Sequence, residues 1–203
     1  ILPYAAKEES RPVLTAACVT LGDPVEVAAA DGFRLAILQV QARLEHLSGQ
    51  RLLIPGHTIK VLAPLWEHAL TAPSLNEDDG PAQMAIGKRL LRLEYTDKLA
   101  RIMFGKVTLI TQLVQGTFPN YPGLVPTAAS SIISFMAEDV RRAVDMLATT
   151  TKGKDITRLS WGDGVLTLSA KAEEVGTITA QVALVSCTTP GRIAFEKRYL
   201  LQL

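Results

Sequence analysis

Apolar and polar residues alternate with a period of two along most of this chain, and this pattern constrains the fold more than any other feature. The stretch VEVAAADGFRLAILQV, residues 25–40, reads as two strands joined by a tight turn at Asp31-Gly32. A period of two places apolar side chains on one face of a sheet, and Asp-Gly is a strong hairpin signal. The same pattern continues over 89–114 and 156–185, with turns expected near Thr96-Asp97, at Gly105 and at Gly162–Gly164. Strands therefore predominate.

One stretch breaks the alternation clearly. In AEDVRRAVDMLATT, residues 137–150, Val140, Val144 and Leu147 recur at helical spacing. Polar residues occupy the opposite face, and two acidic residues lie at the start, where the helix dipole favours negative charge. This pattern predicts an amphipathic helix.

A second helix is predicted in HTIKVLAPLWEHAL, residues 57–70, with Thr58 as its N-cap. Pro64 lies inside this stretch and is expected to kink or restart the helix. The polar segment 71–83 that follows is expected to be a mobile surface loop. A helix followed by a meander of strands thus occurs twice, which predicts an α+β fold built from repeated units.

The segment QLVQGTFPNYPGLVP, residues 112–126, contains three prolines and two aromatic residues, Phe118 and Tyr121. Proline fixes φ and lacks a backbone donor, so this segment cannot join a central sheet ladder. We interpret it as a boundary between two domains, residues 1–126 and 127–203. Whether its aromatic residues form a structural hinge or the rim of a binding site is left open by the local pattern.

The composition restricts the possible partners. Among 203 residues, 21 Lys and Arg balance 20 Asp and Glu, which gives a net charge of +1. This balance provides no bulk attraction to nucleic acid or to a membrane, so any basic surface has to be local. No apolar run approaches the roughly 18 residues that span a bilayer. Cys18 and Cys187 lie in apolar, strand-like runs and are predicted to be buried free thiols, which suits a reducing cytoplasm.

Motifs for catalysis are missing from the sequence. His46, His57 and His68 have no metal-binding spacing with cysteines or carboxylates. The sequence contains no nucleophile elbow, phosphate-binding glycine loop or dinucleotide fingerprint. We therefore expect a protein that is not an enzyme, with no metal site and no cofactor.

Five segments occur together in an order and spacing that resemble a known family. They are RPVLTAACV, AADGFRLAI, LIPGHTIKVLA, VTLITQLVQGTFPNYPGLVP and GVLTLSAKAEEVG. The family is the bacterial DNA sliding clamp, the β subunit of DNA polymerase III. The resemblance covers most of the second clamp domain, residues 1–126, and about the first half of the third, residues 127–203.

The resemblance implies a DNA-clamp fold, in which repeated units of antiparallel sheet carry helices on one face. It also implies a non-catalytic processivity factor, which in its full-length form is a homodimeric ring around duplex DNA of any sequence. DNA polymerase, the clamp loader and repair proteins are expected to dock through short peptides into a cleft. As given, this chain lacks the first domain, the start of the second and the end of the third.

Nine residues match the walls of that cleft by resemblance: Leu14, Ala30, Gly32, Phe33, Arg34, Leu35, Pro119, Gly123 and Leu124. Arg34 is expected to hold a carboxylate or carbonyl of the partner at the rim. A protein that slides should touch phosphates weakly through basic residues. The candidates for such DNA-facing residues are Arg141, Arg142, Lys152, Lys154, His57 and Lys60.

The sequence departs from the family pattern at several positions. Gly56-His57 stands where many clamps have a basic pair, Gly123 where a basic residue is common, and Ala30 where threonine is common. These departures leave an alternative function open, a clamp-like interaction module that binds partner peptides without encircling DNA.

Overall fold

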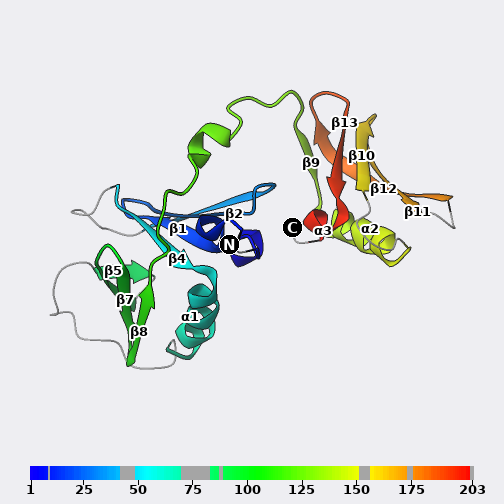
Figure 1. Cartoon of the computed structure of the whole chain (residues 1–203). Coiled ribbons are helices and arrows are strands. Elements are labelled where there is room, and N and C mark those ends of the chain that lie inside the picture. The colour runs from blue at the N-terminus through cyan, green and yellow to red at the C-terminus, as the bar shows by residue number, and fades with distance from the viewer. Residues whose placement is uncertain are drawn as a thin grey trace. The chain divides into compact units, whose positions relative to one another are not determined.

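The computed structural model describes residues 1–8, 10–41, 49–69, 83–86, 89–150, 156–172 and 176–201. The chain forms two compact units, Ile1–Leu124 and Val125–Leu203 (Figure 1). The sequence predicts a boundary two residues later, after Pro126, and the assignment of these units to clamp domains stays a prediction. Within the described helices, none is long and apolar enough to cross a membrane.

The first unit contains two four-stranded antiparallel sheets. The first sheet has the order β3-β2-β1-β4 and the second has the order β5-β6-β7-β8. Their strands are β1 (Ala16–Thr20), β2 (Val25–Ala30), β3 (Leu35–Val40), β4 (Arg51–Pro55), β5 (Gln83–Ile86), β6 (Arg89–Tyr95), β7 (Leu99–Phe104) and β8 (Val107–Gln112). Helix α1 (Gly56–Ala69) connects the two sheets, and three short 3-10 helices, η1 (Leu2–Tyr4), η2 (Pro12–Thr15) and η3 (Tyr121–Leu124), flank them.

The two sheets of this unit share one core with α1. Buried Val19 and Ile54 of the first sheet pack with Ile102 and Phe104 of the second. Trp66 of α1 meets Phe104 with ring centroids 5.3 Å apart. Ile59, Leu62 and Leu65 of α1 pack against the same core.

Helix α1 begins at Gly56, so the prediction that Thr58 caps it is wrong. Thr58 lies within the first turn, where it is buried, and its hydroxyl pairs with that of Thr111 on β8 at 2.8 Å. A Cβ on Gly56 would lie only 2.8 Å from the carbonyl oxygen of Thr15. The close approach of η2 thus explains why glycine occupies this position. The helix continues past Pro64 as one element.

The second unit has one five-stranded antiparallel sheet of order β13-β10-β11-β12-β9. Its elements are β9 (Ile133–Phe135), α2 (Ala137–Thr150), β10 (Ile156–Gly162), β11 (Val165–Ala172), β12 (Gly176–Cys187), β13 (Gly191–Glu196) and the short α3 (Lys197–Leu200). Val144 and Leu147 of α2 are buried against Leu166 and Leu168 of β11. The amphipathic helix predicted over residues 137–150 is confirmed in its bounds and in its buried face.

The predicted turns are also confirmed. The strands β10 and β11 pair up to Gly162 and Val165, and both residues between them have positive φ, 50° at Asp163 and 77° at Gly164. A helix followed by a meander of antiparallel strands occurs twice, from α1 and from α2. The α+β clamp fold expected from the sequence is therefore observed. A mobile loop is predicted over residues 71–83. Of these residues only the last, Gln83, is among those that the structure describes.

Both cysteines are free thiols, as predicted. Cys18 is buried in β1, and this burial raises the pKa of its thiol. Cys187 at the end of β12 is only partly buried, so the predicted burial is wrong for this residue.

The buried hydroxyl pair of Thr58 and Thr111 leads to a testable prediction about the attachment of α1. Thr58→Val should lower the free energy of unfolding by about 1–3 kcal/mol, because it removes the buried partner of the Thr111 hydroxyl. The double variant Thr58→Val, Thr111→Val should cost less than the sum of the two single variants, since neither hydroxyl is then left without its partner. Urea unfolding of the four proteins measures this, and strictly additive costs would contradict the pairing.

Candidate functional site

Residues from two distant parts of the sequence meet on one face of the first sheet, opposite the face that packs on the core shared with α1. Leu14, from η2, is buried together with Phe118 and Tyr121 from the proline-rich segment. Ala30 and Leu35, which face each other across β2 and β3, pack against the same cluster. We call this group the connector cluster. Its members are Leu14, Ala16, Cys18, Ala28, Leu53, Phe118 and Tyr121, with Ala6, Val13, Ala30, Leu35 and Val114 packed against them.

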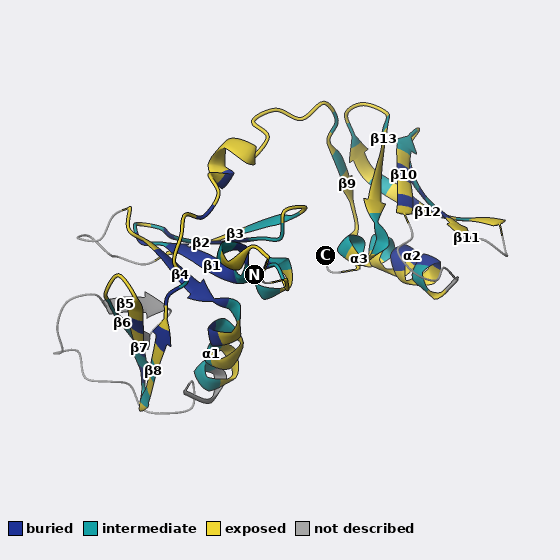
Figure 2. Ribbon diagram, viewed as in Figure 1, coloured by how far each residue is buried: buried dark blue, intermediate teal, exposed yellow. Residues whose placement is uncertain are grey.

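Strands β1 and β4 of the first sheet are consequently buried on both faces, whereas β3 is largely exposed. Along β1, Cys18 belongs to the connector cluster, whereas the next residue, Val19, belongs to the core shared with α1. The register repeats this division on β4, where Leu53 is paired with Cys18 and Leu52 with Val19. Figure 2 shows β1 and β4 almost entirely as buried strands.

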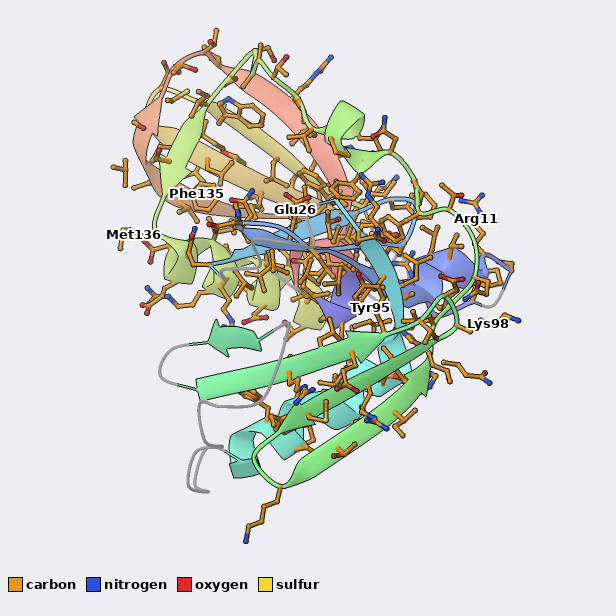
Figure 3. All side chains as sticks on the ribbon, turned by 90° about the vertical axis from the view of Figure 1, so that its left-hand side faces the viewer. Arg11, Glu26, Tyr95, Lys98, Phe135 and Met136 are labelled. Atoms are coloured by element: carbon orange, nitrogen blue, oxygen red, sulfur yellow. The ribbon has the colours of Figure 1, made fainter. Side chains whose placement is uncertain are left out.

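The two aromatic residues of the proline-rich segment hold it on the sheet. Phe118 and Tyr121 are almost fully buried, and their rings meet edge to face with centroids 5.9 Å apart. The Tyr121 hydroxyl donates a hydrogen bond to the carboxylate of Glu26 on β2 (labelled in Figure 3), and the Arg51 guanidinium lies 6.0 Å from the centre of the Tyr121 ring. Burial and the hydrogen bond to Glu26 raise the pKa of Tyr121. These aromatic residues are therefore anchors of the segment.

The turn between β2 and β3 is fixed by Asp31. Its Oδ1 accepts hydrogen bonds from the backbone nitrogens of Phe33 and Arg34, both at 2.9 Å. Its Oδ2 lies 2.8 Å from the Arg34 guanidinium. Burial acts against the charged carboxylate, but these hydrogen bonds and the Arg34 charge outweigh it, and they hold the pKa of Asp31 below its usual value. Gly32 has φ of +92°, and the next side chain, Phe33, is 81% exposed.

Arg34 already has contacts within its own chain. Besides Asp31, the guanidinium donates to the carbonyl oxygen of Pro3 at 2.8 Å and lies 5.0 Å from the centre of the Tyr4 ring. These contacts join the turn to η1. That Arg34 holds a carboxylate or carbonyl of a partner stays a prediction.

A different arginine lies beside the same turn. A Cβ on Gly32 would be 3.4 Å from Nη1 of Arg11, so the exposed Arg11 guanidinium lies against the turn. Arg11 is not predicted as a site residue, because only the fold brings it to Gly32. The sole local signal is its position directly before Pro12.

The remaining predicted cleft residues lie on the solvent side of the proline-rich segment. Pro119 directly follows the buried Phe118, and both Pro119 and Gly123 are exposed. Leu124 ends the 3-10 turn that begins with buried Tyr121, and it is 71% exposed. The structure thus gathers Leu14, Ala30 and Leu35 in the connector cluster. It leaves Phe33 and Leu124 as large exposed apolar side chains, two residues before Leu35 and three residues after Tyr121 in the chain.

The predicted DNA-facing residues that can be placed lie on exposed helix faces. Arg141 and Arg142 are exposed on α2, opposite its buried face, and Arg142 pairs with Asp139 at 2.6 Å. His57 and Lys60 are exposed on α1. Lys152 and Lys154 lie outside the described residues. In the part of the chain that the structure describes, no three His, Cys, Asp or Glu side chains gather in a way that could hold a metal ion.

Comparison with known proteins places this geometry in context. The family model described as DNA polymerase III beta subunit, central domain, matches residues 4–120, which is more than half of the chain. A beta sliding clamp of Caulobacter vibrioides is 25% identical over 176 residues, covering 86% of this chain and 42% of the relative. A beta sliding clamp of Staphylococcus aureus is 26% identical over 198 residues, covering 95% of this chain and 47% of the relative.

Solved structures show the same fold. The crystal structure of a sliding clamp, DNA polymerase III subunit beta, from Bartonella birtlesii bound to griselimycin superposes with a TM-score of 0.77 at 25% identity. That comparison covers 99% of this chain and 51% of the other. The chain therefore spans about half the length of the relatives it matches.

The Asp31 pair leads to a prediction with a defined pH dependence. The folded-state pKa of Asp31 is lowered, so its stabilising effect is fully present above the unfolded-state value of about 3.9 and is lost as the pH falls through the folded-state value. Asp31→Asn should therefore cost about 1–2 kcal/mol at neutral pH and progressively less in acid. Unfolding free energies measured from pH 7 down to acid check this, with the exposed Asp145→Asn as control. A cost that stays constant with pH would contradict the assignment.

Proposed function

Since the chain belongs to the DNA polymerase III beta subunit family, we propose that it is part of a DNA sliding clamp, a non-catalytic protein that encircles duplex DNA and tethers polymerase to it. In the full-length protein this function requires a closed ring, which we propose to be a homodimer working in the cytoplasm. The observation that best supports the proposal is the connector cluster, which joins Leu14, Ala30 and Leu35 to the proline-rich segment.

We propose that partner peptides dock at the margin of this cluster. Leu124 and Phe33 are exposed apolar side chains suited to contact apolar residues of a peptide, and Pro119 and Gly123 lie on the same segment as Leu124. Apolar side chains supply most of the binding energy in such sites, and a few anchors dominate it. The polymerase, clamp loader and repair proteins are the partner classes.

The surroundings of this margin are ordered before any peptide arrives. Asp31 fixes the turn that carries Phe33, and Tyr121 fixes the 3-10 turn that ends in Leu124. A surface that is already ordered loses little conformational entropy on binding, which favours affinity for short peptides. Because Arg34 is joined to Asp31, we propose that the exposed Arg11 guanidinium receives a carboxylate or carbonyl of the peptide.

Duplex DNA is proposed to meet the polar face of α2. Arg141 and Arg142 are exposed there, and the charge of Arg142 is partly offset by Asp139. Weak, solvent-screened contacts of this kind suit a protein that has to move along the phosphate backbone. His57 and Lys60 on α1 and the lysines 152 and 154 are further candidates in this proposal.

One observation favours the alternative, an interaction module that binds peptides without encircling DNA. The exposed face of α1 combines His57 and Lys60 with apolar Val61 and Pro64, so it offers little positive charge. Retention of the full-length protein on circular and linear DNA distinguishes the two functions. A ring slides off linear ends, whereas a module without a ring treats both forms alike.

The peptide site is tested by Leu124→Asp. A charge in an apolar contact should weaken binding of a polymerase-derived clamp-binding peptide by about 2 kcal/mol, and the fold should be retained because Leu124 is largely exposed. The matched control is Ile110→Asp on β8, where the side chain is 61% exposed on a strand of the second sheet and is not part of the connector cluster. Titration calorimetry and thermal melting measure both effects. Equal affinities of wild type and Leu124→Asp would remove Leu124 from the site.

The DNA contact is tested by Arg141→Ala combined with Arg142→Ala in the full-length protein. Each neutralised phosphate contributes roughly 0.9 to the slope of log affinity against log salt, so the slope should fall by about one to two. Arg158→Ala with Arg192→Ala, exposed arginines on the sheet of the same unit, serves as the control. A slope that stays the same in a folded double variant would show that the α2 arginines do not face DNA.

A further inference from the structure

A row of polar side chains crosses the first sheet beside the connector cluster. Thr20 of β1 is paired with Glu26 of β2 and, on its other side, with Arg51 of β4. Glu26 is paired in turn with Gln39 of β3. Cross-strand partners share a face, and Thr20 lies two residues after Cys18, so the polar row lies on the face that carries the connector cluster. The apolar cluster therefore ends at a polar row.

Tyr121 spans the boundary between the cluster and the polar row. Its side chain is buried in the cluster, and its hydroxyl donates a hydrogen bond to the Glu26 carboxylate. The Arg51 guanidinium, two strands away from Glu26, lies 6.0 Å from the ring centre, at the limit of a cation–π contact. Burial raises the pKa of Tyr121, as does the bond to Glu26, so the hydroxyl stays protonated and remains a donor. Polar groups of β2 and β4 thus hold one ring.

Tyr121 is also the last buried residue of the proline-rich segment. Phe118 and Tyr121 are buried, whereas residues 122–130 are all exposed. A Cβ on Gly123 would have no atom closer than the amide nitrogen of Asn120, at 3.9 Å. Leu124 ends the 3-10 turn, three residues after Tyr121. The position of the Leu124 side chain therefore depends on how firmly Tyr121 is held.

The hydrogen bond to Glu26 gives Tyr121 a defined position. Apolar burial is not directional, so burial alone would let the ring shift within the cluster. A hydrogen bond to a carboxylate is directional and roughly twice as strong as one between neutral groups. We propose that Glu26 is a positioning residue of the peptide site: through the Tyr121 hydroxyl it fixes the turn that ends in Leu124, and it thereby sets the affinity for a partner peptide.

This inference rests on the proposed docking of peptides at Leu124, and it adds how that site is controlled. Tyr121 is buried and Glu26 is bonded to it, so neither residue has to touch the peptide. Both act by keeping the free protein in the arrangement that binds. When that arrangement is populated for only a fraction of the time, the apparent affinity falls by the same fraction.

Conservative substitutions at both ends of the hydrogen bond test the proposal. Tyr121→Phe keeps the ring and removes the donor, so it should weaken binding of a polymerase-derived clamp-binding peptide by about five- to tenfold. Glu26→Leu removes the acceptor and should have the same effect. Glu26→Gln keeps an oxygen that accepts from the hydroxyl, so it should restore most of the affinity. The matched control is Tyr95→Phe, at a tyrosine that packs on the other core of this unit. Titration calorimetry measures all five proteins.

A double-variant comparison separates positioning from a general loss of stability. In a Leu124→Ala background, Tyr121→Phe should change the affinity little, because the side chain that it positions is gone. In a Phe33→Ala background it should keep its full effect, since Asp31 fixes the turn that carries Phe33. Equal effects of Tyr121→Phe in the two backgrounds, or an affinity that Glu26→Gln lowers as much as Glu26→Leu, would overturn the proposal.

Backbone order parameters provide a readout that needs no peptide. In the 203-residue chain, the Gly123 and Leu124 amides should have values near those of rigid backbone, about 0.85, in wild type and in Glu26→Gln. Tyr121→Phe should lower both values. Order parameters that Tyr121→Phe leaves unchanged would refute the positioning role, whether or not a peptide binds. A wild-type protein that binds no clamp-binding peptide would instead refute the proposed peptide site, so the two failures are distinguishable.

Discussion

Strands β1 and β4 of the first sheet are buried on both faces, and the rest of the first unit depends on this constraint. One face of β1 packs on the core that α1 shares with the second sheet, and the other packs under the proline-rich segment. The second face carries small residues, Ala16, Cys18 and Ala28, which allow a chain segment to approach closely. Phe118 and Tyr121 then fill the space. Only 5% of the residues in the chain are aromatic, and two of them supply the large apolar surface that this contact buries.

The same arrangement explains how a segment rich in proline can be well placed. Its backbone bonds to β4 from the Val114 nitrogen to the Leu53 carbonyl oxygen at 2.9 Å. The prolines beyond Val114 have no backbone donor, so side chains also hold the segment, among them the Tyr121 hydroxyl on Glu26. The neighbouring turn is fixed in a similar way by Asp31. Both elements are held by contacts within the chain, so their exposed residues, Leu124 and Phe33, are presented by ordered backbone.

Local patterns predicted the elements that local forces determine. The helix over 137–150 and the turn at Asp163-Gly164 follow from periodicity and glycine conformation, and both were found where expected. Thr58 was misassigned because threonine is a good N-cap by type, whereas the helix begins at Gly56 and the Thr58 hydroxyl pairs with Thr111.

The candidate site was only partly predictable, because much of it rests on contacts between distant residues. The convergence of Leu14 with the proline-rich segment came from the resemblance to clamps and is observed in the connector cluster. The roles of Tyr121 and Arg11 were not predicted, since Glu26 lies 95 positions from Tyr121 and Arg11 meets Gly32 only in the fold. The resemblance assigned Arg34 to a carboxylate or carbonyl of a partner, which stays a prediction. Its ion pair with Asp31 was not predicted, because an Asp three residues earlier is no clear signal of a pair in a turn.

Gly56 has a consequence for how this protein can change during evolution. Any side chain at position 56 would collide with the Thr15 carbonyl oxygen. A basic residue therefore cannot occupy this position unless η2 also moves. Substitutions at Val61 and Pro64 meet no such barrier, since both side chains are exposed on the same helix. A lineage selected for more positive charge on α1 would therefore acquire it one to two turns further along the helix.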